Sequence, residues 1–149
     1  MICGNGSLSV YANCNDGVAS KDGLLIAGGS LTVNADGDGF DINGSIVMTD
    51  GTVLVHGPTA NMNGAVDSDR TFSISGGLLV AAGSSGMAQA PGMSSKQNSL
   101  LINFAKPFDA NTLFLYAGYE ICQLCNFDCC DQVEYSISGF PYILSPQER

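Results

Sequence analysis

The chain has 149 residues and carries 14 acidic against 5 basic side chains, which gives a net charge of −9. This balance argues against binding to nucleic acid or to anionic membrane surfaces, because their phosphates would repel the protein. Hydrophobic residues make up 45% of the chain, enough to fill a core, and no apolar run approaches the roughly 18 residues that a membrane-spanning helix needs.

A repeat of about 22 residues runs through the first half of the chain. In four segments a glycine precedes a short run of aliphatic and small residues, and these glycines, Gly6, Gly29, Gly51 and Gly77, are 23, 22 and 26 residues apart. Two more apolar patches recur between them at the same period. Because side chains alternate along a strand, we expect these inward-facing columns: Leu8/Leu31/Val53/Leu79, Val10/Val33/Val55/Ala81, Leu24/Ile46/Phe72, Ile26/Met48/Ile74 and Val18/Phe40/Val66.

The repeat predicts an all-β fold, a parallel β-helix (solenoid) of about four coils with a triangular section. Strands of three to five residues cannot bury an apolar face alone, whereas stacked coils cover one another. The alternative is an antiparallel sandwich, which also has short strands and glycine turns. A sandwich does not require equivalent residues at a fixed spacing, so the repeat favours the solenoid.

A different pattern follows the repeats. Leu100–Phe104, Leu113–Tyr116 and Glu134–Ile137 read as longer strands that are rich in aromatic residues. Because the open end of a solenoid exposes strand edges, we expect these strands to form an antiparallel cap. The sequence is therefore divided into β-helix repeats over 1–104 and a C-terminal β cap with a cysteine cluster over 105–149.

Four short motifs resemble a bacterial family of carbohydrate-binding domains built on a right-handed parallel β-helix. They are Gly37-Asp-Gly-Phe-Asp41, His56-Gly-Pro-Thr59, Asn63-Gly-Ala-Val-Asp67 and Gly83-Ser-Ser-Gly-Met-Ala-Gln-Ala-Pro91. The resemblance covers residues 6 to 104 and does not extend to the cysteine-rich end. It implies a secreted, calcium-dependent module of the cellulose- or pectate-binding type, which binds plant-type or acidic polysaccharide and is not a hydrolase.

Acidic and amide side chains occupy equivalent turns of successive coils. Stacked coils lie about 4.8 Å apart, so carboxylates in one column repel each other. A Ca²⁺ ion, which takes 6–8 oxygen ligands, would turn this repulsion into coordination. The alternative is that these residues only form turns. The candidate ligands are Asp16, Asp38 and Asn63 in one column, Asp41 and Asp67 in a second, and Asn43 and Asp69 in a third.

Six cysteines form two groups, which we expect to form disulfides in an oxidising compartment. Two flank the first coil and four lie within nine residues near the other end. A zinc site built from the second group, or free thiols, remain the alternatives. The pairing cannot be deduced from the sequence. The candidates are Cys3, Cys14, Cys122, Cys125, Cys129 and Cys130.

Catalysis is not expected. His56 is the only histidine, and we expect it to be a solvated or packed turn residue because no nucleophilic triad is recognisable around it. Cations that a β-helix lyase would use are few and scattered. The repeats contain only Tyr11, Phe40 and Phe72 as aromatic residues, and both phenylalanines fall in inward columns. A flat aromatic platform is therefore not expected, whereas binding of uronates through Ca²⁺ is.

Two functions remain open on the sequence alone. The first is a secreted polysaccharide-binding module, at the cell surface or free outside the cell. The second is a structural subunit that assembles end to end into filaments, because the first coil leaves Leu8 and Val10 without a coil beneath them. The first residues show neither a charged nor an apolar signal region, so we expect a signal that was removed or a chain cut from a longer protein.

Overall fold

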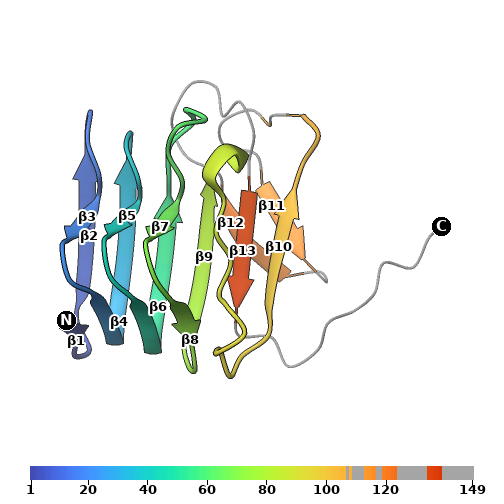
Figure 1. Cartoon of the computed structure of the whole chain (residues 1–149). Coiled ribbons are helices and arrows are strands. Elements are labelled where there is room, and N and C mark those ends of the chain that lie inside the picture. The colour runs from blue at the N-terminus through green and yellow to red at the C-terminus, as the bar shows by residue number, and fades with distance from the viewer. Residues whose placement is uncertain (107, 109–112, 117–118, 124–133, 139–149) are drawn as a thin grey trace.

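The computed structural model describes residues 1–106, 108, 113–116, 119–123 and 134–138. This part of the chain forms a parallel β-solenoid of about four coils, which stack side by side from the N-terminal end in Figure 1. The one helical element in the described residues is a 3₁₀ turn, η1 (Ser85–Met87). No helix in these residues is long and apolar enough to cross a membrane.

The first three coils each contribute strands to two sheets, in which the repeats pair in parallel, and the fourth coil contributes to one of them. The first coil holds β1 (Ile2–Cys3), β2 (Ser7–Ala12) and β3 (Val18–Ser20). The second holds β4 (Leu24–Ala35) and β5 (Phe40–Ile42), and the third holds β6 (Ile46–His56) and β7 (Val66–Ser68). The fourth begins with β8 (Phe72–Ile74) and β9 (Leu78–Gly83).

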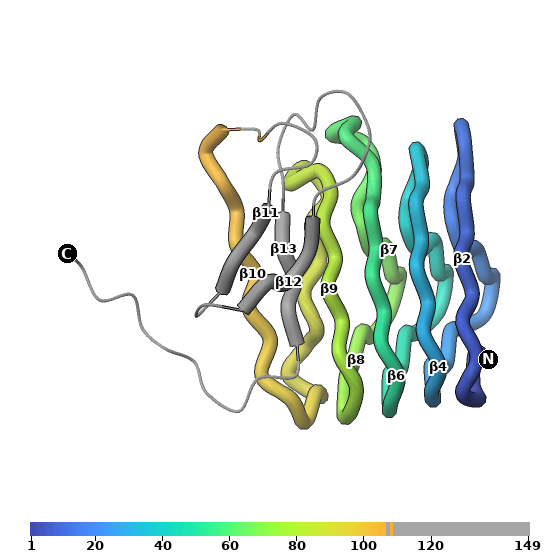
Figure 2. The backbone as a smooth tube through the Cα atoms, turned by 180° about the vertical axis from the view of Figure 1, so that it is seen from behind, coloured from blue at the N-terminus to red at the C-terminus, as the bar shows by residue number. Residues whose placement is uncertain are grey.

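The strands are longer than the sequence pattern predicted. β4 and β6 each join two predicted strands, of three and five residues, into one strand of 12 and 11 residues. Each bends at a corner with an irregular register, where Gly28, Gly29 and Gly51 have φ values of 140°, 84° and 102°. Residues with side chains rarely adopt such values, so glycine lets one strand continue around the corner although the register is irregular there. Seen from behind, β2, β4, β6 and β9 form one continuous face (Figure 2).

The predicted inward columns are confirmed. The register places Leu31 beside Val53 and Val53 beside Leu79, and both Val33 and Val53 are fully buried. The sheet β3–β5–β7 aligns Val18, Phe40 and Val66 in the same way. Stacking identical positions therefore gives a narrow apolar core along the solenoid axis, as expected when each coil covers the next.

The end after β9 is closed by antiparallel strands. β13 (Glu134–Ser138) pairs antiparallel with β9 on one side and with β10 (Ser99–Asn103) on the other. β11 (Leu113–Tyr116) and β12 (Tyr119–Gln123) form a separate antiparallel pair. The predicted cap strands are therefore present, and β12 is an addition. β13 belongs to the same sheet as the repeats, although it comes after the predicted division at residue 104.

In the part of the chain that the structure describes, the opposite end of the solenoid is open. β2 pairs with β4 on one side only, and Leu8, which continues the Leu31 column, remains 49% exposed. Val10, Ala12 and Val18 pack against the core but are only partly buried. The first coil therefore presents both apolar side chains and unpaired strand edges, as the sequence predicted.

Candidate functional site

The first acidic column is held by hydrogen bonds between coils. The backbone N–H of Asp38 donates to Oδ1 of Asp16 at 2.9 Å, and the N–H of Gly64 donates to Oδ1 of Asp38 at 2.6 Å. A neighbouring position repeats the arrangement, because the N–H of Cys14 donates to Oδ2 of Asp36 at 2.8 Å. Each carboxylate thus accepts a backbone amide from another coil, which satisfies a donor at a turn where the strand ladder is interrupted.

The second and third acidic columns lie on the outer side of the β3–β5–β7 sheet. Asp41 in β5 stands directly beside Asp67 in β7. Asn43 and Asp69 follow them, and Nδ2 of Asn43 donates to Oδ2 of Asp69 at 3.3 Å. Asp41 and Asp67 are half-buried, whereas Asn43 and Asp69 are exposed. The alignment of coils predicted from the sequence is therefore correct at these positions.

The stacked carboxylates are under electrostatic strain. Burial raises the pKa of Asp67 from its usual value, and the charges of Asp41 and Asp69 raise it further. Burial also raises the pKa of Asp38, the hydrogen bond from Gly64 opposes this, and neighbouring acids add to the rise. A carboxyl group with a raised folded-state pKa contributes stability below its unfolded pKa, and this contribution is lost as the pH rises through the folded value. At neutral pH, therefore, a bound cation would relieve the fold of this repulsion.

The described residues contain no group of three or more acidic, histidine or cysteine side chains that converge as metal ligands. Asp16 and Asp38 already accept backbone amides. The predicted third member of their column, Asn63, is wrong, because the register of β5 and β7 places Gly64 beside Asp38 and leaves Asn63 one residue before it. The groups left in the acidic columns are Asp41, Asp67, Asp69 and Asn43. Their oxygens suit the chemistry of Ca²⁺. These side chains are separated by the distance between coils and do not converge on one point, so water would have to supply much of the coordination of the ion.

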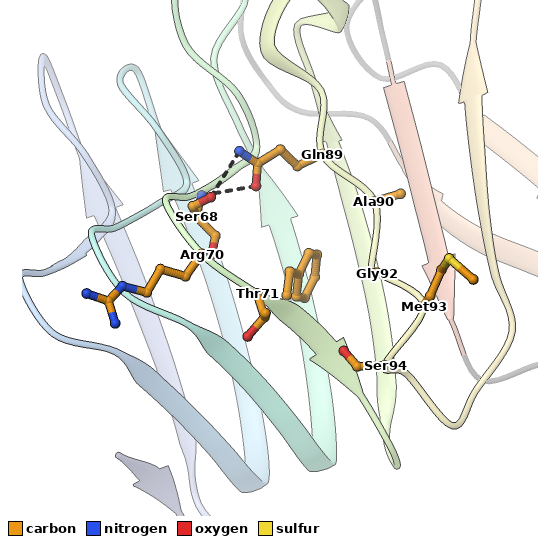
Figure 3. A pocket seen from close by; sticks show the side chains of 9 residues that line it. Ser68, Arg70, Thr71, Gln89, Ala90, Gly92, Met93 and Ser94 are labelled. Atoms are coloured by element: carbon orange, nitrogen blue, oxygen red, sulfur yellow. Dashed lines mark hydrogen bonds between the residues drawn. The ribbon is translucent and has the colours of Figure 1, made fainter.

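Residues 84–97, which we call the fourth rung, follow β9 and lie first beside β7 of the third coil and then beside β8, to which both side chains and backbone attach them. The N–H of Ser68 donates to Oε1 of Gln89 at 3.0 Å, and Nε2 of Gln89 reaches the Ser68 carbonyl at 3.4 Å (Figure 3). The Gln89 amide thus replaces the strand that would otherwise pair there. Its Nε2 also donates to Oδ1 of Asp67 at 3.1 Å. Further along, Ser95 Oγ accepts the N–H of Ile74 at 3.1 Å.

The start of this rung explains much of the motif from Gly83 to Pro91. Oγ of Ser84 accepts the N–H of Gly86 at 3.2 Å and donates to Oδ1 of Asn61 at 3.2 Å. A side chain at Gly86 would overlap the backbone carbonyl of Asn61, so only glycine fits there. Ser84 is completely buried. The motif therefore has a structural role, because it fixes the start of the fourth rung to coil three.

A groove of about 520 Å³ lies between the fourth rung and the corner that joins β7 to β8. Gln89 attaches the rung at Ser68, and the N–H of Gly92 attaches it again at the Phe72 carbonyl at 2.7 Å. Between them Pro91 has no N–H to donate, so the strand ladder cannot continue. The groove is lined by Ser68, Arg70, Thr71, Phe72, Gln89, Ala90, Gly92, Met93 and Ser94 (Figure 3).

The groove combines hydroxyl and amide groups with apolar surface. Thr71 and Ser94 are exposed, and Oγ1 of Thr71 donates to Oγ of Ser45 in the preceding coil at 2.9 Å. Met93 is fully exposed, whereas Phe72 is 6% exposed and belongs mostly to the core. Arg70 is the one charged lining residue, and its guanidinium extends away from Gln89, Gly92 and Ser94 (Figure 3). The groove therefore offers hydroxyl, amide and apolar groups, and its charged lining residue is a cation at the edge.

His56 is packed rather than solvated. It ends β6 beside Ala82 in β9, and burial lowers the pKa of its imidazole. Its Nδ1 is buried and has no hydrogen-bond partner among the described residues. This agrees with the expectation of a packed turn residue and gives His56 no visible role as a ligand.

Cys3 and Cys14 are both free and exposed. They lie on either side of β2, whose six residues span about 20 Å at the rise of an extended strand. The Cα atoms of a disulfide are at most about 7 Å apart, so these two thiols cannot join within one molecule. Cys122 lies in β12, and Cys125, Cys129 and Cys130 lie outside the described residues. The disulfides expected from the sequence are therefore not seen in the described part.

The solenoid matches a known family. A family model described as "Carbohydrate-binding domain-containing protein" matches residues 1–109, which include all four coils and the whole groove. The chain belongs to this family. Neither a curated protein nor a solved structure matches it. The match confirms the resemblance to carbohydrate-binding domains at the level of the family, while calcium dependence and the kind of glycan stay predictions.

Sequence reasoning missed the groove. The motif from Gly83 to Pro91 includes Gln89 and Ala90 of the lining, but the candidate ligands lie on the acidic columns. Thr71, Gly92, Met93 and Ser94 belong to no motif that the repeat makes visible. The signal that could have indicated the groove is Pro91-Gly92. A proline in the rung that should continue the ladder indicates that the chain leaves the coil there.

Proposed function

We propose that this protein is a non-catalytic polysaccharide-binding module that holds its glycan in the groove beside the fourth rung. The observation that carries the proposal is that the matched family region itself builds this groove of hydroxyl, amide and apolar groups. Sites for small ligands are concave, with apolar walls and a few polar groups that fix orientation. The groove has this composition and lies on a rigid solenoid.

The lining groups suit a sugar. Hydroxyl groups such as those of Thr71 and Ser94 both donate and accept hydrogen bonds, as sugar hydroxyls do. The Met93 side chain and the accessible edge of Phe72 offer apolar contact to the C–H groups of a sugar ring. The sequence predicted an acidic or plant-type polysaccharide. The hydroxyl, amide and apolar lining supports a neutral polysaccharide of plant type.

The non-catalytic assignment rests on the family and on the lining. Glycoside hydrolysis in most families requires a pair of carboxyl groups that flank the scissile bond. The groove is lined by hydroxyl, amide and apolar groups together with Arg70. Such a lining can bind a glycan but offers no acid–base pair at the sugar.

Retention without cleavage is the expected result when the protein is run on affinity gels that contain soluble plant polysaccharides. At least one polymer should slow the protein, since the groove supplies both hydrogen bonds and apolar contact. Prolonged incubation should release neither reducing ends nor unsaturated products. Normal migration in every polymer would reject the binding function, and product formation would reject the non-catalytic assignment.

We further propose that Ca²⁺ binds at the outer acidic columns, through Asp41 and Asp67 with Asp69 and Asn43. Two observations support this. These oxygens are not committed to backbone amides as those of Asp16 and Asp38 are, and the charges of Asp41 and Asp69 raise the pKa of Asp67. Ca²⁺ would supply positive charge between coils at these positions, while the backbone ladder keeps the coils in register.

Chelation is expected to lower the melting temperature of the protein. A ligand at 100 times its dissociation constant adds about 2.7 kcal/mol to stability, and about 1 kcal/mol corresponds to about 2–8 °C for domains of this size range. Asp41→Ala and Asp67→Ala should each remove most of the difference between calcium and EDTA. Asp16→Ala is the control, because it should lower the melting temperature equally in both conditions. An identical melting curve in calcium and in EDTA would exclude the site.

We propose that the module acts outside the cell, where polysaccharides of plant type are found.

A second candidate function is end-to-end assembly into filaments. The observation that favours it is the open first coil, where β2 has one unpaired edge and Leu8 is 49% exposed. The free thiols of Cys3 and Cys14 lie on this same coil. An uncovered edge of this kind favours pairing with another chain.

Assembly should appear as concentration-dependent growth in mass by light scattering or as filaments in electron micrographs. Leu8→Lys should abolish it, because a lysine on a strand edge opposes pairing. Leu25→Lys is the matched control, since Leu25 is 37% exposed on the side of the solenoid rather than at its end. A monomer at every concentration would eliminate the filament function.

A further inference from the structure

We infer that the open first coil docks onto the first coil of a second copy of this chain, so that two copies meet head to head in a closed dimer. The inference goes beyond the proposed binding function, which stands whether or not the copies pair. It gives the open surface a different partner from the one that end-to-end growth of a filament would need.

The first coil is open along two sheets at once. β2 and β3 each pair with the second coil on one side, and no described strand lies on the other. Leu8, Val10 and Val18 continue three columns of the core there at incomplete burial. The far end of the molecule differs, because β10 ends one sheet while β7, in the other, is followed by the fourth rung. A second first coil therefore matches both open edges, which the capped end does not.

The pattern of β2 limits how two copies can pair. Leu8 and Val10 continue inward columns, whereas Ser9 and Tyr11 alternate with them on the outer side. Residues directly opposite each other in an antiparallel pair share one face, so apolar side chains must meet apolar side chains. Two registers keep all but one residue of β2 paired in this way. One places Ser9 opposite Ser9 and Leu8 opposite Val10, and the other places Val10 opposite Val10.

The exposed cysteines distinguish the two registers. Cys3 and Cys14 are free and cannot join within one molecule. With Ser9 at the centre, Cys14 lies opposite Gly4 of the second copy and next to the Cys3 of that copy. Strands lie about 4.8 Å apart and one residue rises about 3.4 Å, so the two Cα atoms come within about 6 Å, as a disulfide requires. With Val10 at the centre the two cysteines are three residues out of step, about 10 Å along the strand, which is too far.

Both cysteines are held in place by the second coil. Cys3 stands beside Ala27 in the register of β1 and β4, and the N–H of Cys14 donates to Oδ2 of Asp36 at 2.8 Å. The backbone of each cysteine is therefore ordered before a second copy arrives, which lowers the entropic cost of the contact.

Charge does not oppose this contact. Residues 1–23, which form the first coil, contain one lysine and two aspartates, a net charge of −1, whereas the whole chain carries −9. The register centred on Ser9 sets Asp16 opposite Ile2 of the second copy rather than opposite another carboxylate. The remaining negative charge lies on the later coils and the cap, where it keeps other faces of two copies apart.

Two disulfides can then join the copies, each between Cys3 of one and Cys14 of the other. Their formation needs an oxidant, for which a small-molecule disulfide such as oxidised glutathione is sufficient. Two protein thiols are oxidised to one disulfide while one oxidised glutathione is reduced to two glutathione thiols, which take up the two protons. Pairing of the strands does not depend on these bonds, which lock the dimer in an oxidising compartment.

The first experiment measures the mass of the whole chain in reductant by analytical ultracentrifugation over a range of concentrations. We expect a mass that levels off at twice 15.4 kDa. Leu8→Lys should weaken the association at least about a hundredfold, because it sets a lysine against Val10 twice in each dimer. Leu25→Lys, on the side of the solenoid, should not. A mass that grows past two copies, or a monomer at every concentration, would overturn the inference.

The second experiment uses the cysteines and does not require Leu8→Lys to fold. After treatment with oxidised glutathione, Cys3→Ser alone and Cys14→Ser alone should form no bond through the first coil, because each lacks one partner of every pair. An equal mixture of the two variants should restore one bond per dimer. Mass spectrometry locates the bonds after chymotryptic cleavage at Tyr11, which separates the two cysteines.

The outcomes separate the inference from the proposed function. Bonds between two copies of Cys3, bonds from the first coil to the later cysteines, or no bond in the mixture would overturn the head-to-head register. None of these results bears on glycan retention, which Leu8→Lys should keep on the affinity gels. A wild-type dimer that no polysaccharide retains would reject the binding function and leave the dimer standing.

Discussion

Replacing Phe40 with alanine is expected to lower the free energy of unfolding by about 3–5 kcal/mol. Phe40 is 1% exposed in the second coil, between Val18 of the first coil and Val66 of the third. Phe40 is among the largest fully buried side chains, and the register of the sheet fixes its stacked neighbours, so its removal leaves a cavity in the core. Because domains are stable by only about 5–15 kcal/mol, the loss is a large share of the total.

Urea unfolding followed by circular dichroism measures this loss. The control is Tyr11→Ala, which removes an aromatic ring that is 71% exposed and should change stability by no more than about 0.5 kcal/mol. A loss below about 1 kcal/mol for Phe40→Ala would show that the coils collapse around the cavity, in which case the stacking of columns would not set the stability.

Gln89→Ala is expected to loosen the wall of the groove and to weaken glycan binding together with stability. The substitution leaves the N–H of Ser68 without its acceptor beside a buried side chain, which costs about 1–3 kcal/mol. It also removes the contacts of Nε2 with Asp67 and with the Ser68 carbonyl. The rung keeps its attachments at Ser84, Gly92 and Ser95, but the wall of the groove at position 89 is no longer fixed to the third coil.

Calorimetry and thermal unfolding should therefore change together for Gln89→Ala. Gln97→Ala is the matched control, because Gln97 lies in the same rung and donates a single bond to the Gly77 carbonyl, at 3.1 Å, away from the groove. It should lower stability less and leave glycan affinity unchanged. Equal affinity in the wild type and Gln89→Ala would show that the fourth rung does not shape the site.

The repeat was sufficient to predict the core. Equivalent residues at a constant spacing must stack in a solenoid, so the columns through Leu31 and through Val18, Phe40 and Val66 follow from the sequence alone. The continuous strands β4 and β6 did not follow. Glycine was interpreted as the end of a strand, whereas the positive φ values at Gly28 and Gly29 let one strand turn a corner.

The site was harder to predict, for a physical reason. A carboxylate in a turn can bind a cation or accept a backbone amide, and the sequence does not distinguish the two. In the structure, Asp16 and Asp38 accept backbone amides. Asp41 and Asp67 accept no backbone amide of this kind and remain the candidates for binding a cation. Gln89 presents the same difficulty, because its amide replaces a strand only through its distance and orientation. A side chain that replaces a strand in this way occurs at one coil only, so it leaves no repeating pattern in the sequence.

The carboxylate-to-amide bonds between coils have a consequence for how the length of this protein can change in evolution. The bond from Asp38 to Asp16 joins positions 22 residues apart, and the bond from Gly64 to Asp38 joins positions 26 residues apart. Each therefore connects one coil with the same place in the next. If tandem duplication inserted a whole coil, the new coil would bring an N–H that donates to the preceding coil and a carboxylate that accepts from the following coil. The solenoid can thus grow or shrink by complete coils, whereas a partial duplication would leave one carboxylate and one amide unpaired.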